Sequence, residues 1–303
     1  SGRPGIRCTD LQAWRAGHAG AGARRAAGGP VEQSAVLPAR QVRDATAAAA
    51  PTVVLYEYPF NEGIRTMLRL EHLFGRLGQL LPRDAPLDHH FALATVFEIM
   101  DVAARADLKS DLLKELERHR AQLQGYRGNP RISEAALDDI TTRVDRCHEQ
   151  LNQLVGKAGQ ALTGNEWLMS LRSRMNIPGG TCEFDLPSYF AWQQHPAERR
   201  RADLRQWTSS FTPLSDALHL LLSLVREGGH AQRQVAVGGQ FQQSLPVGRS
   251  FQLMRVGLDA AGELVPELSG HRLMVSVRLL RWESGGRLRP CTDDVAFDLM
   301  LCA

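Results

Sequence analysis

The stretch Ile177-Pro-Gly-Gly-Thr-Cys-Glu-Phe-Asp-Leu-Pro187 lies where the character of the sequence changes. Before it, apolar residues recur every three or four positions, the period of amphipathic helices. Beyond it the pattern shifts, and from Gly228-Gly229 onward apolar and polar residues alternate, as in half-buried strands. The two glycines after Pro178 favour a turn between two parts of the molecule. The sequence therefore predicts an α+β fold, with a helical domain followed by a small antiparallel β-sheet domain.

The first part begins with a β-branched and aromatic run, Val53–Tyr58, that predicts a strand ending at Pro59. A lone strand is unstable, so we expect it to join the sheet formed by the C-terminal part. Asn61 is a suitable helix cap. Helices are expected over residues 62–81, 88–104, 107–123, 133–162 and 165–175.

The pattern over residues 133–162 is the most regular. Its apolar residues are separated by three or four positions throughout, which predicts one long amphipathic helix packed antiparallel to the preceding helix. These residues are Ile140, Val144, Cys147, Leu151, Leu154, Ala158 and Leu162.

The second part contains further helices and then strands. We expect helices over 187–193, 197–209 and 213–227, and strands over 234–237, 250–259, 273–280 and 295–301. Gly285-Gly286 and Pro290 separate the last two strands, which predicts that these strands pair as a hairpin with a long loop. The expected division is an extension over residues 1–52, a mainly helical domain over 53–176, and helices plus the β domain over 177–303.

The extension at residues 1–52 is rich in Ala, Gly and Arg and lacks periodic apolar positions, so we expect it to be disordered. Its seven arginines and three acidic residues give it a charge of +4, which leaves 3 − 4 = −1 for the rest. The high pI therefore comes mainly from the extension. Residues 226–290 nevertheless carry nine arginines against five acidic residues, so nucleic-acid binding through both regions stays open as the alternative function.

Several function classes find no support. Apolar runs are much shorter than a membrane span, and the five cysteines are dispersed without a CxxC pair, as in a protein of a reducing compartment. Gly179-Gly180 lacks the lysine of a phosphate-binding loop. His89 and His90 are adjacent, and adjacent side chains on a helix diverge too far to share a metal. We therefore expect no enzyme, no cofactor and no metal.

Basic residues offer the remaining signal. Lys109, Lys114, Arg118 and Arg120 alternate with carboxylates at helical spacing, which is typical of a solvated face. Arg69, Arg105, Arg272 and Arg278 lie outside that mixed face. The even separation of Arg272 and Arg278 would place them on one face of a strand. Arginine can bind a carboxylate with two parallel hydrogen bonds, which would suit an acidic peptide. Composition alone nevertheless favours the simpler interpretation that these four arginines are unrelated surface charges.

Longer blocks of sequence resemble the ZapD family, bacterial division proteins that bundle FtsZ filaments. The resemblance runs from about Val53 to the C-terminus and includes the Ile177–Pro187 stretch. Its other blocks are Tyr56–Glu62 with Arg65-Thr66-Met67-Leu68-Arg69, Asp101-Val102 with Leu112-Leu113-Lys114-Glu115-Leu116, and Ser269-Gly270-His271-Arg272 with Arg278. Met274 departs from the family, in which a basic residue is common at that position.

The resemblance implies a non-enzymatic cell division factor located in the cytoplasm at the mid-cell division ring. It implies a homodimer that binds the C-terminal tail of FtsZ through a basic surface between the helical part and the sheet. Arg69, Arg105, Arg272 and Arg278 fall in the matching blocks and are the expected binding residues. The expected partners are FtsZ and a second copy of the chain, with no membrane.

Overall fold

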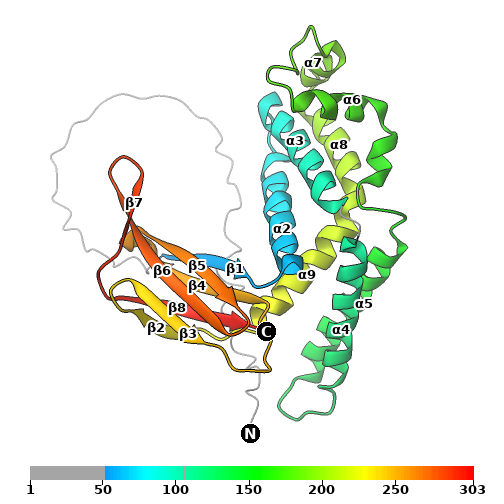
Figure 1. The fold of residues 1–303 in the computed structure, drawn as a ribbon. Coiled ribbons are helices and arrows are strands. Elements are labelled where there is room, and N and C mark those ends of the chain that lie inside the picture. Colours follow the sequence, from blue (N-terminus) through cyan, green and yellow to red (C-terminus); the bar gives the residue numbers. More distant parts are fainter. Residues whose placement is uncertain (1–51, 105–106) are drawn as a thin grey trace, which may run out of the picture.

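The computed structural model describes residues 52–104 and 107–303, so the expected disorder of the N-terminal extension falls almost entirely outside the described residues. A helical layer and a β-sandwich lie side by side (Figure 1). The α+β prediction is confirmed. None of the helices described is both long and apolar enough to cross a bilayer.

The helices before the glycine turn largely follow the sequence pattern. Asn61 caps the first one, because its side chain accepts a hydrogen bond of 2.8 Å from the backbone nitrogen of Ile64. The helix expected from residue 88 begins two residues earlier, at Pro86. The bounds are α2 Glu62–Leu80, α3 Pro86–Ala103, α4 Leu108–Gln124, α5 Glu134–Gln153, η1 Gln160–Gly164 and α6 Glu166–Met175.

Helices α4 and α5 form the antiparallel hairpin that the sequence predicts. Two ion pairs show the direction, because Glu117 pairs with His148 and Arg120 pairs with Asp145. The expectation that the second helix continues to Leu162 is wrong, since α5 ends at Gln153. The chain leaves the helix at Leu154, which is extended, and Gly156 and Gly159 then adopt φ of 70° and 77°, a left-handed conformation in which a helix cannot resume.

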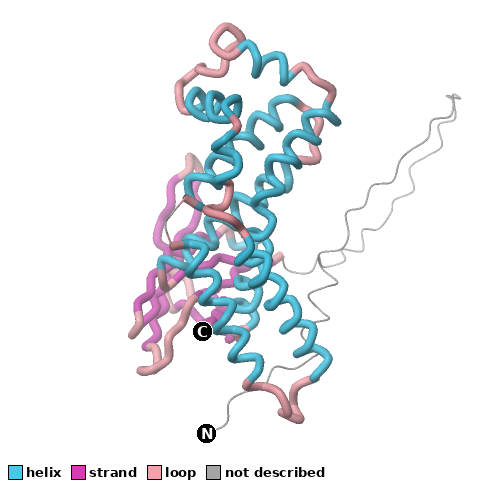
Figure 2. The backbone as a smooth tube through the Cα atoms, turned by 90° about the vertical axis from the view of Figure 1, so that its right-hand side faces the viewer, coloured by secondary structure: helices cyan, strands magenta, loops and turns pink. Residues whose placement is uncertain are grey.

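After the glycine turn the chain returns to the same apolar core. The remaining helices are α7 Pro187–Gln193, α8 Ala197–Thr208 and α9 Thr212–Glu227, with η2 Ser209–Phe211 between the last two. Buried residues of all three helices belong to one cluster with those of α2 to α6. Helix α9 contacts α2, α4 and α5. Figure 2 shows the helices in front of the strands, which lie on one side of the helical layer. The division at residues 176 and 177 stays a prediction.

The described strands form two sheets that pack face to face. One has the order β1-β4-β8-β2, and the other has β3-β6-β5 with β7 beside β6. One apolar cluster contains buried residues of both sheets. The bounds are β1 Val53–Pro59, β2 Gln232–Ala236, β3 Gln240–Ser244, β4 Leu253–Asp259, η3 Ala260–Gly262, β5 Leu264–His271, β6 Met274–Glu283, β7 Arg287–Pro290 and β8 Val295–Cys302.

Strand pairing corrects one expectation and confirms another. The runs 273–280 and 295–301 do not pair as a hairpin, because β6 pairs with β3, β5 and β7, whereas β8 pairs with β4 and β2 in the other sheet. Alternation identifies a strand but not its neighbour. Strand β1 joins the C-terminal sheet as predicted, antiparallel to β4, with Val53 opposite Asp259 and Pro59 opposite Leu253.

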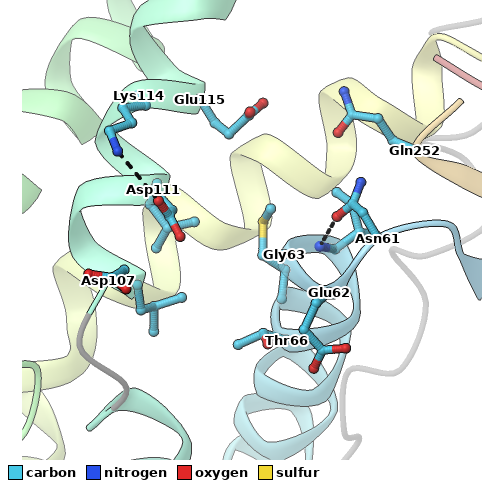
Figure 3. Close-up of a pocket in the computed structure, with 13 residues that line it drawn as sticks. Asn61, Glu62, Gly63, Thr66, Asp107, Asp111, Lys114, Glu115 and Gln252 are labelled. Atoms are coloured by element: carbon cyan, nitrogen blue, oxygen red, sulfur yellow. Dashed lines mark hydrogen bonds and ion pairs between the residues drawn. The ribbon is translucent and has the colours of Figure 1, made fainter. Parts of the chain in front are cut away.

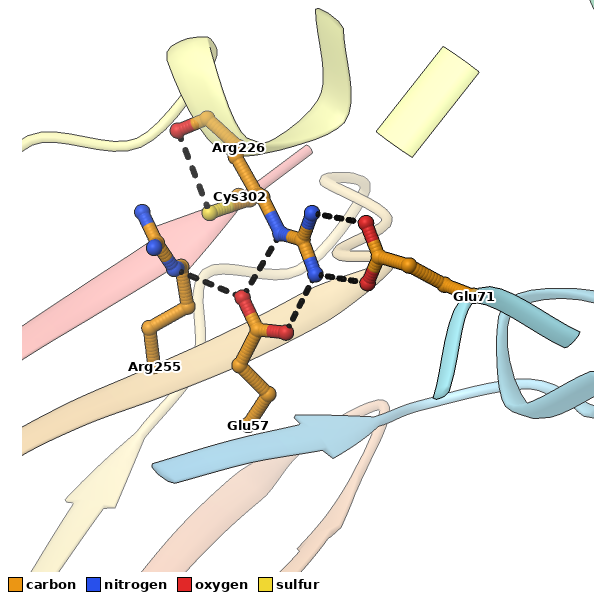
Figure 4. Close-up of polar contacts among 5 residues, drawn as sticks. All are labelled: Glu57, Glu71, Arg226, Arg255 and Cys302. Carbon is orange, nitrogen blue, oxygen red and sulfur yellow. Dashed lines mark hydrogen bonds and ion pairs between the residues drawn. The ribbon is translucent and has the colours of Figure 1, made fainter. Parts of the chain in front are cut away.

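The helical layer and the sandwich meet around a partly buried ionic network that the sequence analysis does not anticipate. Arg226, at the end of α9, donates hydrogen bonds of 2.6–2.8 Å to Glu57 of β1 and Glu71 of α2 (Figure 4). Arg255 of β4 donates a further bond of 2.9 Å to Glu57. Apolar contact supports the same junction, since Leu253 and Cys302 belong to the helical cluster.

Candidate partner-binding site

Arg69 lies on a basic face of α2. Arg65, Leu68, Arg69 and His72 follow one another at helical spacing and line a cleft of about 480 Å³ between α2 and α3. We call it the basic cleft. Its remaining lining residues are Pro59, Leu73, Glu98 and Val102. Apolar side chains thus accompany two arginines and a histidine, an arrangement that suits an anionic ligand with an apolar group.

Both arginines of the basic cleft already share a weak partner. Glu62 lies 3.3 Å from Arg65 and 3.6 Å from Arg69, and all three side chains are well exposed. Exposed pairs of this kind contribute about 0–1 kcal/mol. A carboxylate from another molecule could therefore replace Glu62 at little cost in free energy.

Arg272 lies in a turn and not within a strand. His271 ends β5 and is paired with Met274, the first residue of β6, so Arg272 and Leu273 form a two-residue hairpin loop. The prediction that Arg272 and Arg278 share one strand face is wrong, because the strand begins only after Arg272. The arginine is instead exposed at the end of the hairpin.

The β5–β6 turn packs against the link between β1 and α2. A Cβ atom at Gly270 would lie 2.6 Å from Cε1 of Phe60, so the Phe60 ring lies directly against this glycine. The hydroxyl of Tyr58 also donates a long hydrogen bond of 3.5 Å to the Gly270 carbonyl oxygen. Pro59, between these two aromatic residues, lines the basic cleft. The turn that carries Arg272 and the cleft that carries Arg69 therefore contact the same short segment.

Arg278 lies further along β6, in the middle of its sheet. It is opposite Gln240 of β3 and Glu267 of β5, and its guanidinium is 3.6 Å from the Glu267 carboxylate. Both side chains are about half exposed, so this ion pair is also weak. Four residues of strand separate Arg278 from Met274, a distance of about 13 Å at 3.3 Å per residue.

The remaining basic residues considered in the sequence analysis are Arg105 and those on the mixed face of α4. Arg105 lies outside the described residues. On the mixed face of α4, Lys114 pairs with Asp111, Arg118 with Glu115, and Arg120 with Asp145 across the hairpin. These exposed pairs agree with the solvated face expected from the sequence. Lys109 differs, because its ammonium donates hydrogen bonds to the backbone carbonyl oxygens of Asn152 and Leu154.

A second cleft, of about 440 Å³, lies on the other side of the first turns of α2, facing α4 (Figure 3). Four carboxylates and one lysine line it together with apolar side chains, so it favours cationic ligands and differs from the basic cleft. The charged residues are Glu62, Asp107, Asp111, Lys114 and Glu115.

The adjacent histidines are both occupied by structural contacts. Nε2 of His89 is 2.6 Å from the Arg83 carbonyl oxygen, and Nδ1 accepts a hydrogen bond of 2.9 Å from buried Arg200. Nδ1 of His90 lies 2.7 Å from the hydroxyl of Tyr189. Burial lowers the pKa of both histidines, and the nearby Arg200 charge lowers that of His89 further. Among the described residues, no cluster of three or more His, Cys, Asp or Glu side chains could hold a metal.

Sequence reasoning did not include Arg65 and His72 among the candidate binding residues beside Arg69. The signal was present, because basic residues at positions 65, 69 and 72 lie on one helix face with Leu68 among them. It also missed Glu57, Glu71 and Arg226, for which no local pattern exists, since the three residues are far apart in the chain.

Comparison with known proteins identifies the family of this chain. The family model described as "ZapD: Cell division protein" matches residues 68–278, a range that includes all four predicted arginines. Proteins named "Cell division protein ZapD" from Ralstonia pickettii, Ralstonia nicotianae and Cupriavidus pinatubonensis are each 52% identical over 251 residues. Each alignment covers 82% of this chain and 99% of the relative. The chain therefore belongs to the ZapD family of cell division proteins.

Proposed function

We propose that this cell division protein binds the flexible C-terminal tail of FtsZ and, as a cytoplasmic homodimer at the mid-cell ring, cross-links FtsZ filaments into bundles. The observation that carries the proposal is the junction described above. There, the basic cleft of α2 and the turn bearing Arg272 contact the same segment, residues 58–60.

The chemistry of this junction suits an extended peptide that carries both acidic and apolar side chains. Arg65 and Arg69 offer forked donors to carboxylates, and Leu68, Leu73 and Val102 offer an apolar surface beside them. Arg272 would contact an acidic group further along the same peptide. Arg105 and Arg278 complete the proposed set, with Arg278 exchanging its weak pair with Glu267 for a carboxylate of the tail.

A homodimer would turn a weak contact into a stable cross-link. Ordering a flexible tail costs conformational entropy, so a single site is expected to bind at about micromolar affinity. Once one tail is bound, the second site of the dimer meets another tail at a high effective concentration. Bundling then requires no strong individual contact.

Charge reversal tests the proposed residues. Arg69→Glu, Arg105→Glu, Arg272→Glu and Arg278→Glu should each reduce the amount of FtsZ that sediments as bundles, with unchanged circular dichroism spectra. Arg131→Glu, on the exposed α4–α5 loop, is the matched control and should bundle normally. Normal bundling by all four reversal variants would contradict the proposed site.

Salt dependence distinguishes a charged contact from an apolar one. Raising the ionic strength from roughly 50 to 300 mM shortens the screening length and should weaken bundling. Bundling that does not change over this range would indicate an apolar interface.

A further inference from the structure

The ionic network at the junction has a composition that makes it both neutral and directional. Two glutamates, Glu57 and Glu71, face two arginines, Arg226 and Arg255, so the charges cancel. The Arg226 guanidinium donates four hydrogen bonds, two to each carboxylate. Because the guanidinium is planar and its donors are fixed, such bonds define the direction between the groups as well as their distance.

Burial makes this network hard to rearrange. The side chains of Arg226, Glu57 and Glu71 are only 22%, 18% and 24% exposed. Burial alone would lower the pKa of Arg226, but its hydrogen bonds with Glu71 and Glu57 outweigh that effect and raise the pKa. The guanidinium is therefore held as a cation between the two carboxylates.

The network closes a junction that the chain crosses at two short links. Residues 60–61 join β1 to α2, and residues 228–231 join α9 to β2. Two such links would allow the helical layer to rotate against the sandwich. Apolar contact through Leu253 and Cys302 opposes separation but sets no direction. Arg226 binds one residue of β1 and one of α2, so it fixes the angle between the two layers (Figure 4).

The same network holds both ends of residues 57–71, the part of the chain that contains Pro59 and Arg69 of the basic cleft. Glu57 lies two residues before Pro59 of the basic cleft, and Glu71 lies two residues after Arg69. Between them, Phe60 contacts Gly270 of the hairpin that carries Arg272. A change in the angle between α2 and β1 would therefore change the spacing between Arg69 and Arg272.

We propose that Arg226 is a positioning residue for partner binding. By bridging Glu57 and Glu71 it holds α2 at one angle to the sandwich, so that Arg69 and Arg272 engage the same acidic peptide together. This inference rests on the proposed function. The partner contacts neither Arg226 nor its two carboxylates.

Arg226→Lys separates geometry from charge, because lysine keeps the positive charge but cannot bond both carboxylates in the forked arrangement. We expect this variant to bind a peptide of the FtsZ tail about fivefold more weakly, within the range of residues that couple to a site without touching the ligand. Circular dichroism should not change, and small-angle X-ray scattering should report a broader distribution of distances. Arg233→Lys, in an exposed pair with Asp298, is the control.

A double-mutant cycle provides the readout that a general loss of stability would not alter. In the wild-type background, Arg69→Ala and Arg272→Ala should be energetically coupled, because one rigid site presents both arginines. In the Arg226→Lys background this coupling should disappear. Should Arg226→Lys fail to fold, Glu71→Gln removes one charge while keeping a hydrogen-bond acceptor, and the same cycle is measured there.

The outcomes separate the two proposals. A wild-type chain that does not bind the tail peptide overturns the proposed function itself. Wild-type binding with unchanged affinity and unchanged coupling in Arg226→Lys or Glu71→Gln overturns the positioning role alone.

Discussion

The stability of the junction can be tested by removing the Arg226 guanidinium while keeping most of its aliphatic chain, as in Arg226→Met. Removing one partner of a buried ion pair costs about 3–5 kcal/mol, because the remaining charge is left without compensation. Here two carboxylates lose their partner, although Arg255 still contacts Glu57. Their residual exposure of 18% and 24% favours the lower end, about 3 kcal/mol.

Urea unfolding monitored by circular dichroism measures this cost. With a urea dependence of about 3 kcal/mol per molar, the unfolding midpoint should fall by about 1 M. Changing Glu71 to an amide as well, as in Arg226→Met/Glu71→Gln, should recover part of the loss, because Glu57 keeps its ion pair with Arg255 and no unpaired charge is left at the junction. Arg233→Met removes an exposed ion pair and should change the free energy of unfolding by less than about 1 kcal/mol. A midpoint shift for Arg226→Met no larger than that of Arg233→Met would show that the ionic network contributes little to the stability of the junction.

Two further predictions concern stability. Burial and the charge of Arg200 lower the pKa of His89, so the unfolded chain binds a proton near pH 6.5 that the folded chain refuses. The free energy of unfolding should therefore fall as the pH drops below about 6.5. His89→Gln, whose amide can donate and accept at the same place, should reduce this fall. An equal loss of unfolding free energy between pH 7.5 and pH 5.5 in the wild type and the variant, measured by urea titration, would argue against it. Gly239→Ala should cost well over 1 kcal/mol, because φ is 73° and a Cβ would lie 2.2 Å from the Cys291 carbonyl oxygen. Gly248→Ala, with φ of 85° but open space around it, should cost about 1 kcal/mol of stability, and thermal melts compare the two variants. Equal losses would show that the close approach of the Cys291 carbonyl oxygen to Gly239 is unimportant.

Local patterns in the sequence predicted local structure well. The β-branched and aromatic residues of Val53–Tyr58 identify β1, and the need of a lone strand for a partner correctly places it in the C-terminal sheet. Asn61 marked the start of α2 because capping depends only on the next few residues. The period of Leu154, Ala158 and Leu162 is misleading, because it continues beyond the end of α5 at Gln153 and past Gly156 and Gly159, whose positive φ excludes a continuous helix.

Non-local features could not be read in this way. Alternation does not reveal which strands pair, so β6 and β8 were joined in one hairpin although they belong to different sheets. Arg272 was placed on a strand because the position of the turn depends on the register between β5 and β6. Glu57, Glu71 and Arg226 meet only once the helical layer and the sandwich have packed together.

Co-sedimentation of the chain with full-length FtsZ and with FtsZ lacking its last dozen or so residues tests whether the proposed binding of the C-terminal tail is what bundles the filaments. We predict that full-length FtsZ sediments as bundles together with the chain, and that the truncated FtsZ forms filaments that the chain neither binds nor bundles. Equal bundling of both forms would contradict the account.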